Sequence, residues 1–274
     1  MNPIIKDLQT VGMYSGFEEY YPRTRDRADI GVLKSSSNDL IILDKDPKVD
    51  YSSQPAFETS ATYEDIARRK TMLANYLYGS SWLDIGTANG GMLNACADLF
   101  ATVEGVEPNR GMSKNIPFST YDSIGDLESG KYSMVTMYHV LEHIPNPIDF
   151  LSRVRESMSV GGKIIIEVPH AKDALLTHYN LEEFKAFTFW SQHLILYTMD
   201  VLDRMMRAAG FNGNSMHSVQ RYGLSNHLYW LKERKPGGQY KFPVRDLQLE
   251  KRYTSWLQDR GMTDTIVAIG RKEK

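Results

Sequence analysis

The sequence predicts an α/β fold with a doubly wound, mostly parallel sheet. Short apolar runs that suit buried parallel strands alternate with amphipathic stretches that suit helices. One of these runs turns through several glycines into a helical stretch, an arrangement found where open α/β sheets bind ligands. A chain of 274 residues, 42% hydrophobic and 24% charged, can bury a core as one large domain with appendages.

Residues 1–58 are predicted to form an N-terminal cap segment. They are rich in Pro, Ser and Asp turn signals, and one short apolar run at 40–43 could pair as a strand. Residues 59–274 are predicted to form the main domain, without internal repeats. Within it, residues at about 223–258 are expected to be a substrate-side insertion rich in aromatic and basic residues.

The main domain is expected to begin with a helix from about Thr62, where Thr62 and Asp65 suit a capping box, to Gly79. Core strands are expected at 81–85, 103–107, 134–138, 163–168 and 265–269. Further helices are expected at 92–100, 148–158 and 198–209. Gly161 and Gly162 are expected to end the second of these, and Gly210 the third.

Composition and charge narrow the function classes. The single Cys96 excludes an internal disulfide and a Cys-based metal cluster. No apolar run approaches the roughly 20 residues of a membrane span, and the N-terminus lacks a signal-peptide pattern. We therefore expect a cytoplasmic protein with no membrane partner.

The charge distribution also bears on the choice of partner. Residues 217–252 are locally basic, with eight Lys/Arg against three acids, but the whole chain has a formal net charge of −2. Because this patch is short, a nucleic-acid partner is not expected. The sequence predicts no particular oligomeric state.

The most informative stretch is 82–91, an apolar strand followed by a glycine-rich turn. It can be aligned with the dinucleotide fingerprint G-x-G-x-x-G only by placing Ala88 at the second glycine, where a methyl group would crowd a pyrophosphate. Asp84, just before the turn, would repel phosphates. A cationic ligand such as S-adenosylmethionine (SAM), with its ammonium and sulfonium, suits this carboxylate better.

The stretch 84–90 resembles the first motif of class I SAM-dependent methyltransferases, although the family usually has glycine where this chain has Ala88. Glu107, which is 23 residues beyond Asp84, matches the family's acid that bridges both ribose hydroxyls. The segments 132–147, 158–169 and 207–211 resemble later parts of the same family in the expected order. The resemblance implies a Rossmann-like seven-stranded sheet with an antiparallel last strand. It also implies a set of cofactor-binding residues: Asp84, Gly86, Thr87, Ala88, Gly90, Glu107, Pro108 and Tyr138.

Candidate catalytic residues follow two predicted strands. His139 and His143 lie in the turn after 134–138, and His170 follows the strand at 163–168, so each could act as a base or orient the acceptor. His139, Glu142 and His143 also resemble the Glu-x-x-Glu-His metal motif of ubiquinone-type O-methyltransferases and small-RNA end methyltransferases, with His139 in place of the first Glu. Because two His and one Glu are an incomplete ligand set, a divalent metal is considered but not favoured. The structural alternative is that Glu142 and His143 cap and orient the turn.

Candidate substrate-binding residues are Arg221, Tyr222, His227 and His193. Basic residues beside aromatics in the insertion could bind a phosphate- or carboxylate-bearing acceptor, or could be a solvated basic face. The sequence therefore predicts methyl transfer from SAM to a small acceptor, an oxygen of a sugar or of an anionic biosynthetic intermediate. Four alternatives stay open: an N- or C-methyltransferase, a metal-dependent RNA methyltransferase, a non-catalytic SAM-binding protein, and a nicotinamide-dependent oxidoreductase.

Overall fold

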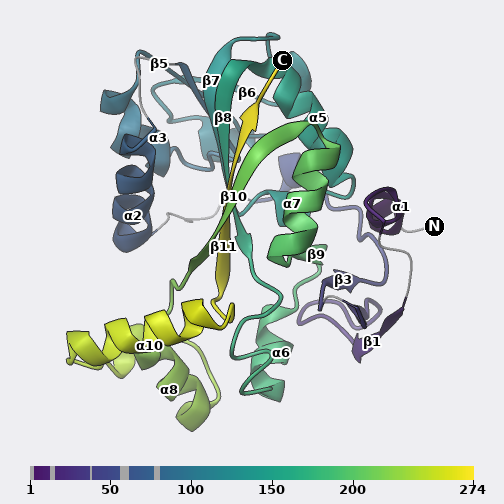
Figure 1. Cartoon of the computed structure of the whole chain (residues 1–274), viewed down its shortest axis with the longest axis vertical. Coiled ribbons are helices and arrows are strands. Elements are labelled where there is room, and N and C mark those ends of the chain that lie inside the picture. The colour runs from purple at the N-terminus through teal and green to yellow at the C-terminus, as the bar shows by residue number, and fades with distance from the viewer. Residues whose placement is uncertain (1–2, 13–15, 38, 56–61, 77–80) are drawn as a thin grey trace.

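A seven-stranded sheet forms the centre of the protein (Figure 1). The structure is a computed structural model that describes residues 3–12, 16–37, 39–55, 62–76 and 81–274. The strand order is β10-β11-β8-β7-β4-β5-β6. These strands are β4 (Ser81–Ile85), β5 (Thr102–Val106), β6 (Ser119–Tyr121), β7 (Tyr132–Tyr138), β8 (Met158–Pro169), β10 (Phe211–Val219) and β11 (Thr265–Lys272). Strands β4 to β8 pair in parallel and β11 is antiparallel to both of its neighbours, which confirms the predicted fold.

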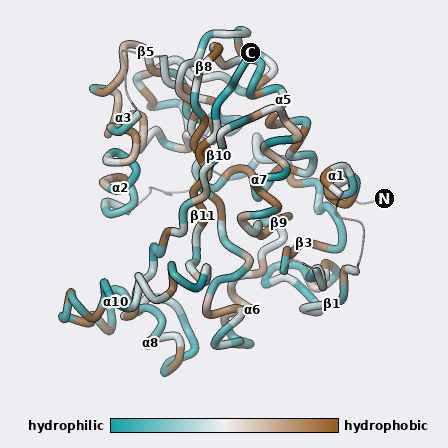
Figure 2. Tube along the Cα trace, in the orientation of Figure 1, coloured by the Kyte–Doolittle hydropathy of each residue, from teal (hydrophilic) through white to brown (hydrophobic). Residues whose placement is uncertain are grey.

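Helices cover both faces of this sheet. They are α2 (Tyr63–Ala74), α3 (Gly91–Cys96), α4 (Arg110–Ser113), α5 (Pro147–Ser157) and α7 (Met199–Ala208). Helices α2 and α3 lie on one face, and α5 and α7 lie on the other (Figure 1). Along β8, Ile165 packs into the core on the α2 and α3 side, while Ile164 and Ile166 pack into the core on the opposite side. Because both faces are buried, the central strands are mostly apolar, as the brown centre of Figure 2 shows.

The five strands predicted by residue number are all present, but two predicted helix ends differ. The helix predicted at 92–100 ends at Cys96 and is followed by the 3₁₀ helix Ala97–Leu99. Helix α5 ends at Ser157 and β8 begins at once, so Gly161 and Gly162 lie within the strand instead of ending the helix. A side chain at Gly162 would come within 2.8 Å of the Ser159 carbonyl oxygen, so this glycine permits a close backbone approach.

The start of α2 follows the prediction. Thr62 is its N-cap, and the Thr62 hydroxyl accepts a hydrogen bond from the Asp65 backbone N–H. The predicted end of this helix at Gly79 and the predicted domain boundary between 58 and 59 lie outside the described residues.

The N-terminal segment contains α1 (Pro3–Thr10) and most of a second, four-stranded sheet of order β1-β2-β3-β9. Its strands are β1 (Phe17–Tyr21), β2 (Val32–Ser35), β3 (Ile41–Leu43) and β9 (Ile195–Leu196). Strand β3 confirms the strand expected at 40–43, and its partner β9 comes from the main domain. Asp7 accepts a hydrogen bond from the Ile148 backbone N–H at the start of α5. The N-terminal segment thus contacts the rest of the chain through both strand pairing and side-chain hydrogen bonds.

The predicted insertion folds into three helices, α8 (Leu224–Glu233), α9 (Gly238–Lys241) and α10 (Leu247–Asp259). We call residues 224–259 the arm. It extends from the β10 and β11 end of the sheet and lies beside α6 (Glu182–Thr188), at the lower left of Figure 1. Glu250 on α10 accepts hydrogen bonds from the Leu224 and Ser225 backbone N–H groups, so α10 caps α8. None of the described helices is long and apolar enough to cross a membrane.

Candidate active site

The turn after β4 has the backbone conformation that its glycines suggest. Gly86, Ala88 and Gly90 have φ angles of 74°, 50° and 78°. A side chain at Gly86 would come within 2.4 Å of a Val140 methyl group, so the turn passes close to the loop after β7. Ala88 occupies a left-handed position that costs an L-residue roughly 1–2 kcal/mol. Ala88, which stands where the family usually has glycine, therefore has a strained backbone conformation.

The two predicted cofactor acids lie at the ends of neighbouring parallel strands. Asp84 is 3% exposed, accepts a hydrogen bond from the Thr136 hydroxyl, and has its pKa raised to about 6 by burial. Glu107 accepts hydrogen bonds of 2.9 Å from the backbone N–H groups of Ala88 and Asn109. Burial also raises the pKa of Glu107. Glu107 thus connects the turn after β4 with the loop after β5, and each oxygen keeps a second lone pair for a ligand hydroxyl.

Tyr138, another predicted cofactor residue, presents a buried polar atom to the same place. Its hydroxyl has no hydrogen-bond partner among the described residues. The Arg69 guanidinium lies 4.3 Å from the centre of the Tyr138 ring. Because buried hydroxyls are normally paired, this one is a natural contact for a bound ligand.

An ion-pair network on α2 borders the site and was missed by the sequence analysis. Arg68 and Arg69 both donate to the carboxylate of Glu167 on β8, at 2.9 Å and 2.5 Å. Burial opposes ionisation of Glu167, but the hydrogen bond from His139 and the charge of Arg69 hold its pKa well below the usual value. Asp65 pairs with Arg221 at 2.6 Å. The spacing i, i+3, i+4 of these α2 residues was the available signal, since it places them on one helix face.

The loop after β7 brings several predicted residues together. His139 has a φ of 58°, and the 3₁₀ helix Leu141–His143 follows it. His139 Nδ1 lies 3.1 Å from Glu142 Oε1, and its Nε2 lies 2.8 Å from Arg221 Nη1. Burial opposes ionisation of Glu142, but its hydrogen bond with His139 lowers the pKa. His139 thus connects the candidate catalytic loop with the candidate substrate residue Arg221.

Hydrogen bonding fixes the tautomer of His143. Its Nδ1 lies 2.7 Å from the Gln192 carbonyl oxygen, and a carbonyl can only accept, so Nδ1 carries the hydrogen. The lone pair is therefore on Nε2. Burial lowers the pKa of His143, against the raising effect of the Glu142 charge, so the ring is neutral near pH 7.

A possible ligand set for a metal differs from the predicted one. The ligand atoms of Glu142, His143 and His193 lie within 4.8 Å of one another, and this group does not include His139. Glu142 Oε2 is buried and has no hydrogen-bond partner among the described residues. Burial and the neighbouring His143 lower the pKa of His193 to about 3, so both imidazoles are neutral, as ligands must be.

The other predicted site residues make fewer contacts with the turn after β4 and the loop after β7. Tyr222 lies beside Arg221, whose guanidinium is 5.3 Å from the Tyr222 ring centre. His227 is buried in the arm, where its Nδ1 lies 2.7 Å from the Tyr253 hydroxyl. His170 is 3% exposed, and its Nδ1 lies 2.9 Å from the Thr263 carbonyl oxygen, so it is a buried residue and does not face solvent. The roles of His170 and His227 stay predictions.

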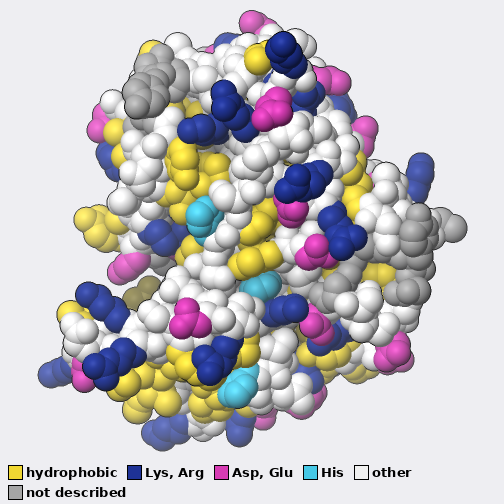
Figure 3. All heavy atoms as spheres, viewed as in Figure 1, with side chains coloured by type: hydrophobic (Ala, Val, Ile, Leu, Met, Phe, Trp, Pro, Cys, Tyr) yellow, Lys and Arg dark blue, Asp and Glu magenta, His cyan; other side chains and the backbone are white. Residues whose placement is uncertain are grey.

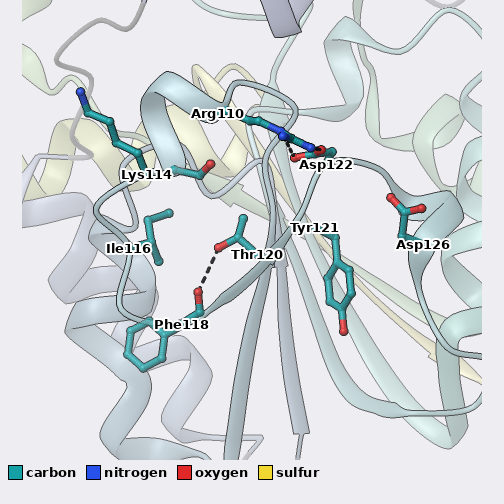
Figure 4. Close-up of a pocket in the computed structure, with 9 residues that line it drawn as sticks. Arg110, Lys114, Ile116, Phe118, Thr120, Tyr121, Asp122 and Asp126 are labelled. Carbon is teal, nitrogen blue, oxygen red and sulfur yellow. Dashed lines mark hydrogen bonds and ion pairs between the residues drawn. The ribbon is translucent and has the colours of Figure 1, made fainter.

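A pocket of about 580 Å³ opens at the β6 edge of the sheet (Figure 4). Arg110 and Asp122 form an ion pair across its rim. Its lining residues are Arg110, Ser113, Lys114, Ile116, Phe118, Thr120, Tyr121, Asp122 and Asp126. None of the predicted site residues lines it, and we assign it no part in the reaction.

A doubly wound sheet with an acid at each of two adjacent strand ends and a glycine turn between them defines an α/β enzyme of the nucleoside-binding class. Residues 59–215 match the family model described as Methyltransferase domain. That match covers more than half of the chain, and the chain belongs to this methyltransferase family.

Relatives of known name are distant. The chain is 27% identical over 100 residues to a ubiquinone biosynthesis O-methyltransferase from Burkholderia vietnamiensis. The aligned residues cover 32% of this chain and 43% of that protein. It is 27% identical over 104 residues to a protein of the same name from Shewanella pealeana, covering 33% and 44%. The chain thus spans less than half the length of these curated relatives.

Two solved structures share the fold. The SAM complex of phosphoethanolamine N-methyltransferase 2 from Haemonchus contortus has a TM-score of 0.52 and 19% identity, covering 80% of this chain and 54% of that one. A SAM-dependent methyltransferase from Archaeoglobus fulgidus has a TM-score of 0.52 and 16% identity, covering 76% and 92%. The predicted class, a SAM-dependent methyltransferase of Rossmann-like fold, is confirmed.

Proposed function

We propose that this chain transfers the methyl group of SAM to an oxygen of a small acceptor, a sugar or an anionic biosynthetic intermediate. The observation that carries the proposal is the pair of buried acids, Asp84 and Glu107, on either side of the turn at Gly86–Gly90. Asp84 would face the ammonium of the methionine part, and Glu107 would accept hydrogen bonds from the ribose hydroxyls. The unpaired hydroxyl of Tyr138 offers a further polar contact.

In the proposed reaction the acceptor oxygen forms a bond to the methyl carbon while the bond from that carbon to sulfur breaks. SAM supplies an already activated methyl group, so holding the acceptor in line accounts for much of the rate. The acceptor proton passes to Nε2 of His143, the nitrogen left free by the Gln192 carbonyl. S-adenosylhomocysteine and the methyl ether are the products.

Arg221 is the proposed contact for an anionic acceptor. Its guanidinium is held between Asp65 and His139, so it is directed toward the catalytic loop rather than toward bulk solvent. A fixed guanidinium suits phosphate and carboxylate groups. The name of one neighbouring structure supports this class, since that protein is a phosphoethanolamine N-methyltransferase and its named acceptor carries a phosphate.

A thermal-shift panel of SAM, S-adenosylhomocysteine, NADH and NADPH tests the cofactor assignment, because a ligand that binds only the folded state raises the melting temperature. We expect the two adenosyl ligands to stabilise the wild type and the control Asp98→Asn, whose carboxyl group is exposed on the surface. They should not stabilise Asp84→Asn. A shift with a nicotinamide ligand would overturn the proposal. Release of S-adenosylhomocysteine with phosphorylated, carboxylated and neutral acceptors then tests the acceptor class.

In a second version of the proposed reaction a divalent cation takes part. The observation that favours it is the unpaired Oε2 of Glu142, which lies close to the neutral imidazoles of His143 and His193. Glu142, His143 and His193 would hold the ion, which would lower the pKa of the acceptor hydroxyl. Calorimetric titration of the chelator-treated protein with Zn²⁺ and Mn²⁺ tests this version. Saturable binding that is lost in Glu142→Gln and in His193→Ala supports it, and equal binding by Glu142→Gln excludes it.

A further inference from the structure

The exposed apolar side chains of the protein gather on the arm. Eight large hydrophobic residues are exposed in the described part of the chain, and five of them belong to the arm. They are Leu228, Tyr240, Phe242, Leu247 and Leu249. Tyr240 and Leu247 are 74% and 72% exposed. Such a concentration marks an interaction surface, whereas scattered single residues do not.

Basic side chains surround these apolar residues. Between residues 232 and 252 there are seven Lys/Arg and three acids, although the whole chain has a net charge of −2. Two of the three acids serve as helix caps: Glu250 accepts from the start of α8, and Asp246 accepts from the start of α10. Figure 3 shows dark blue Lys and Arg side chains beside yellow hydrophobic ones over the arm, at the lower left.

The two most exposed apolar residues of the arm, Tyr240 and Leu247, have less than a third of their surface covered by the rest of the protein. The inward face of the arm is made of other side chains, including Tyr229, Trp230 and Leu257, which are buried. The Trp230 ring packs at 5.1 Å, edge to face, on Phe184 of α6. Because the arm has its own core contact and its own cap, the outer residues can be changed without removing its internal support.

We propose that the outer surface of the arm, residues 240–252, binds the surface of an anionic lipid bilayer. Aromatic and leucine side chains set among Lys and Arg suit the boundary between headgroups and acyl chains, where the rings enter and the bases pair with anionic headgroups. The bases on this surface are Lys241, Arg245, Lys251 and Arg252, all exposed.

Charge complementarity selects a bilayer surface as the occupant. The arm is basic and the rest of the chain is acidic, so a negatively charged plane attracts the arm and repels the remainder. Adsorption of this kind requires no spanning helix. It therefore agrees with the absence of a membrane-crossing helix among the described residues. It departs from the sequence-based expectation of no membrane partner, which rested on the lack of a spanning segment and of a signal peptide.

Co-sedimentation of the full chain with vesicles tests the proposal. We expect binding to vesicles of phosphatidylcholine mixed with phosphatidylglycerol, weaker binding at high salt, and little binding to phosphatidylcholine alone. The triple variant Lys241→Glu, Arg245→Glu, Lys251→Glu should lose on the order of tenfold or more in partitioning. The double variant Tyr240→Ser, Leu247→Ser should weaken binding at low salt and at high salt.

The matched control is Lys48→Glu with Val160→Ser, which changes one exposed base and one exposed apolar residue outside the arm. It should bind as the wild type does. Equal binding of the wild type to both vesicle types, no binding to either, or unchanged binding by the arm variants would each overturn the proposal. Stabilisation by SAM, measured in parallel, shows that every variant is folded and keeps this result separate from the test of methyl transfer.

Discussion

The hydroxyl oxygen of Tyr51 lies 3.1 Å from Nδ1 of His143, and the two rings meet edge to face at 5.6 Å. Tyr51 belongs to the N-terminal segment, and His143 lies in the loop after β7. The segment predicted as a cap therefore contributes a side chain to the wall of the candidate active site. The Gln192 carbonyl keeps the hydrogen of His143 on Nδ1, and Tyr51 packs against the same ring.

Replacing His143 by Gln should lower kcat by about 10²–10⁴-fold, the usual contribution of a positioned base. SAM affinity should not change, because the cofactor acids lie on other strands. Tyr51→Phe is the graded comparison: it keeps the ring contact, loses only the hydroxyl, and should cost less. Steady-state release of S-adenosylhomocysteine and calorimetric SAM binding measure the two quantities. An unchanged kcat in His143→Gln would remove His143 from the mechanism.

Ala88→Gly should raise the free energy of unfolding. The φ of 50° at Ala88 costs roughly 1–2 kcal/mol, and the extra freedom of glycine in the unfolded chain returns about 0.4–1 kcal/mol of that. A net gain of up to about 1 kcal/mol is expected in urea denaturation, with SAM binding retained. Ala95→Gly, within α3, is the opposite control and should destabilise the protein. A loss of stability in Ala88→Gly would show that the turn is unstrained.

Glu167→Gln should destabilise the protein by about 3–5 kcal/mol, since it removes one partner of a buried ion-pair network and leaves Arg69 uncompensated. Glu167 is fully buried and Arg69 nearly so. The matched change Glu128→Gln affects a carboxylate that is 76% exposed and should cost no more than about 1 kcal/mol. Urea denaturation compares the two variants. Equal effects would mean that the network contributes little.

Asp173→Asn should change the pH dependence of stability. Burial, together with the charge of Asp264, raises the pKa of Asp173 from 3.8 to about 8. A raised carboxyl pKa means that the folded state binds the proton more tightly, so its contribution to stability is complete below about pH 4 and is lost as the pH rises toward 8.

Asparagine keeps an oxygen for the hydrogen bond that Asp173 accepts from the Leu175 N–H and cannot ionise. The melting temperature of Asp173→Asn should therefore exceed that of the wild type at pH 8 by more than at pH 5. Asp200→Asn, at a site 59% exposed, should show no such trend. A parallel dependence in both variants would indicate that Asp173 is ionised throughout this range.

Local patterns predicted the cofactor half of the site. Strand β4 occupies the predicted residues 81–85, and the acids Asp84 and Glu107 lie at adjacent strand ends, as the motif implied. Buried parallel strands are apolar runs and tight turns need glycine, so both features are written in contiguous residues. Strand β6 was not predicted, because its three residues at the sheet edge, one exposed and two half-buried, carry little apolar signal.

The sequence by itself determined the class of the protein, because a strand, a turn and an acid within a short stretch are sufficient to form a nucleoside site. Only the tertiary structure decided which side chains meet at the candidate acceptor side. There His193 takes a position beside His143, with ring centres 5.0 Å apart, and Arg221 reaches Asp65 across 156 residues of sequence. These contacts depend on how distant segments pack against the same sheet edge, and the packing energy that selects them has no local sequence signature.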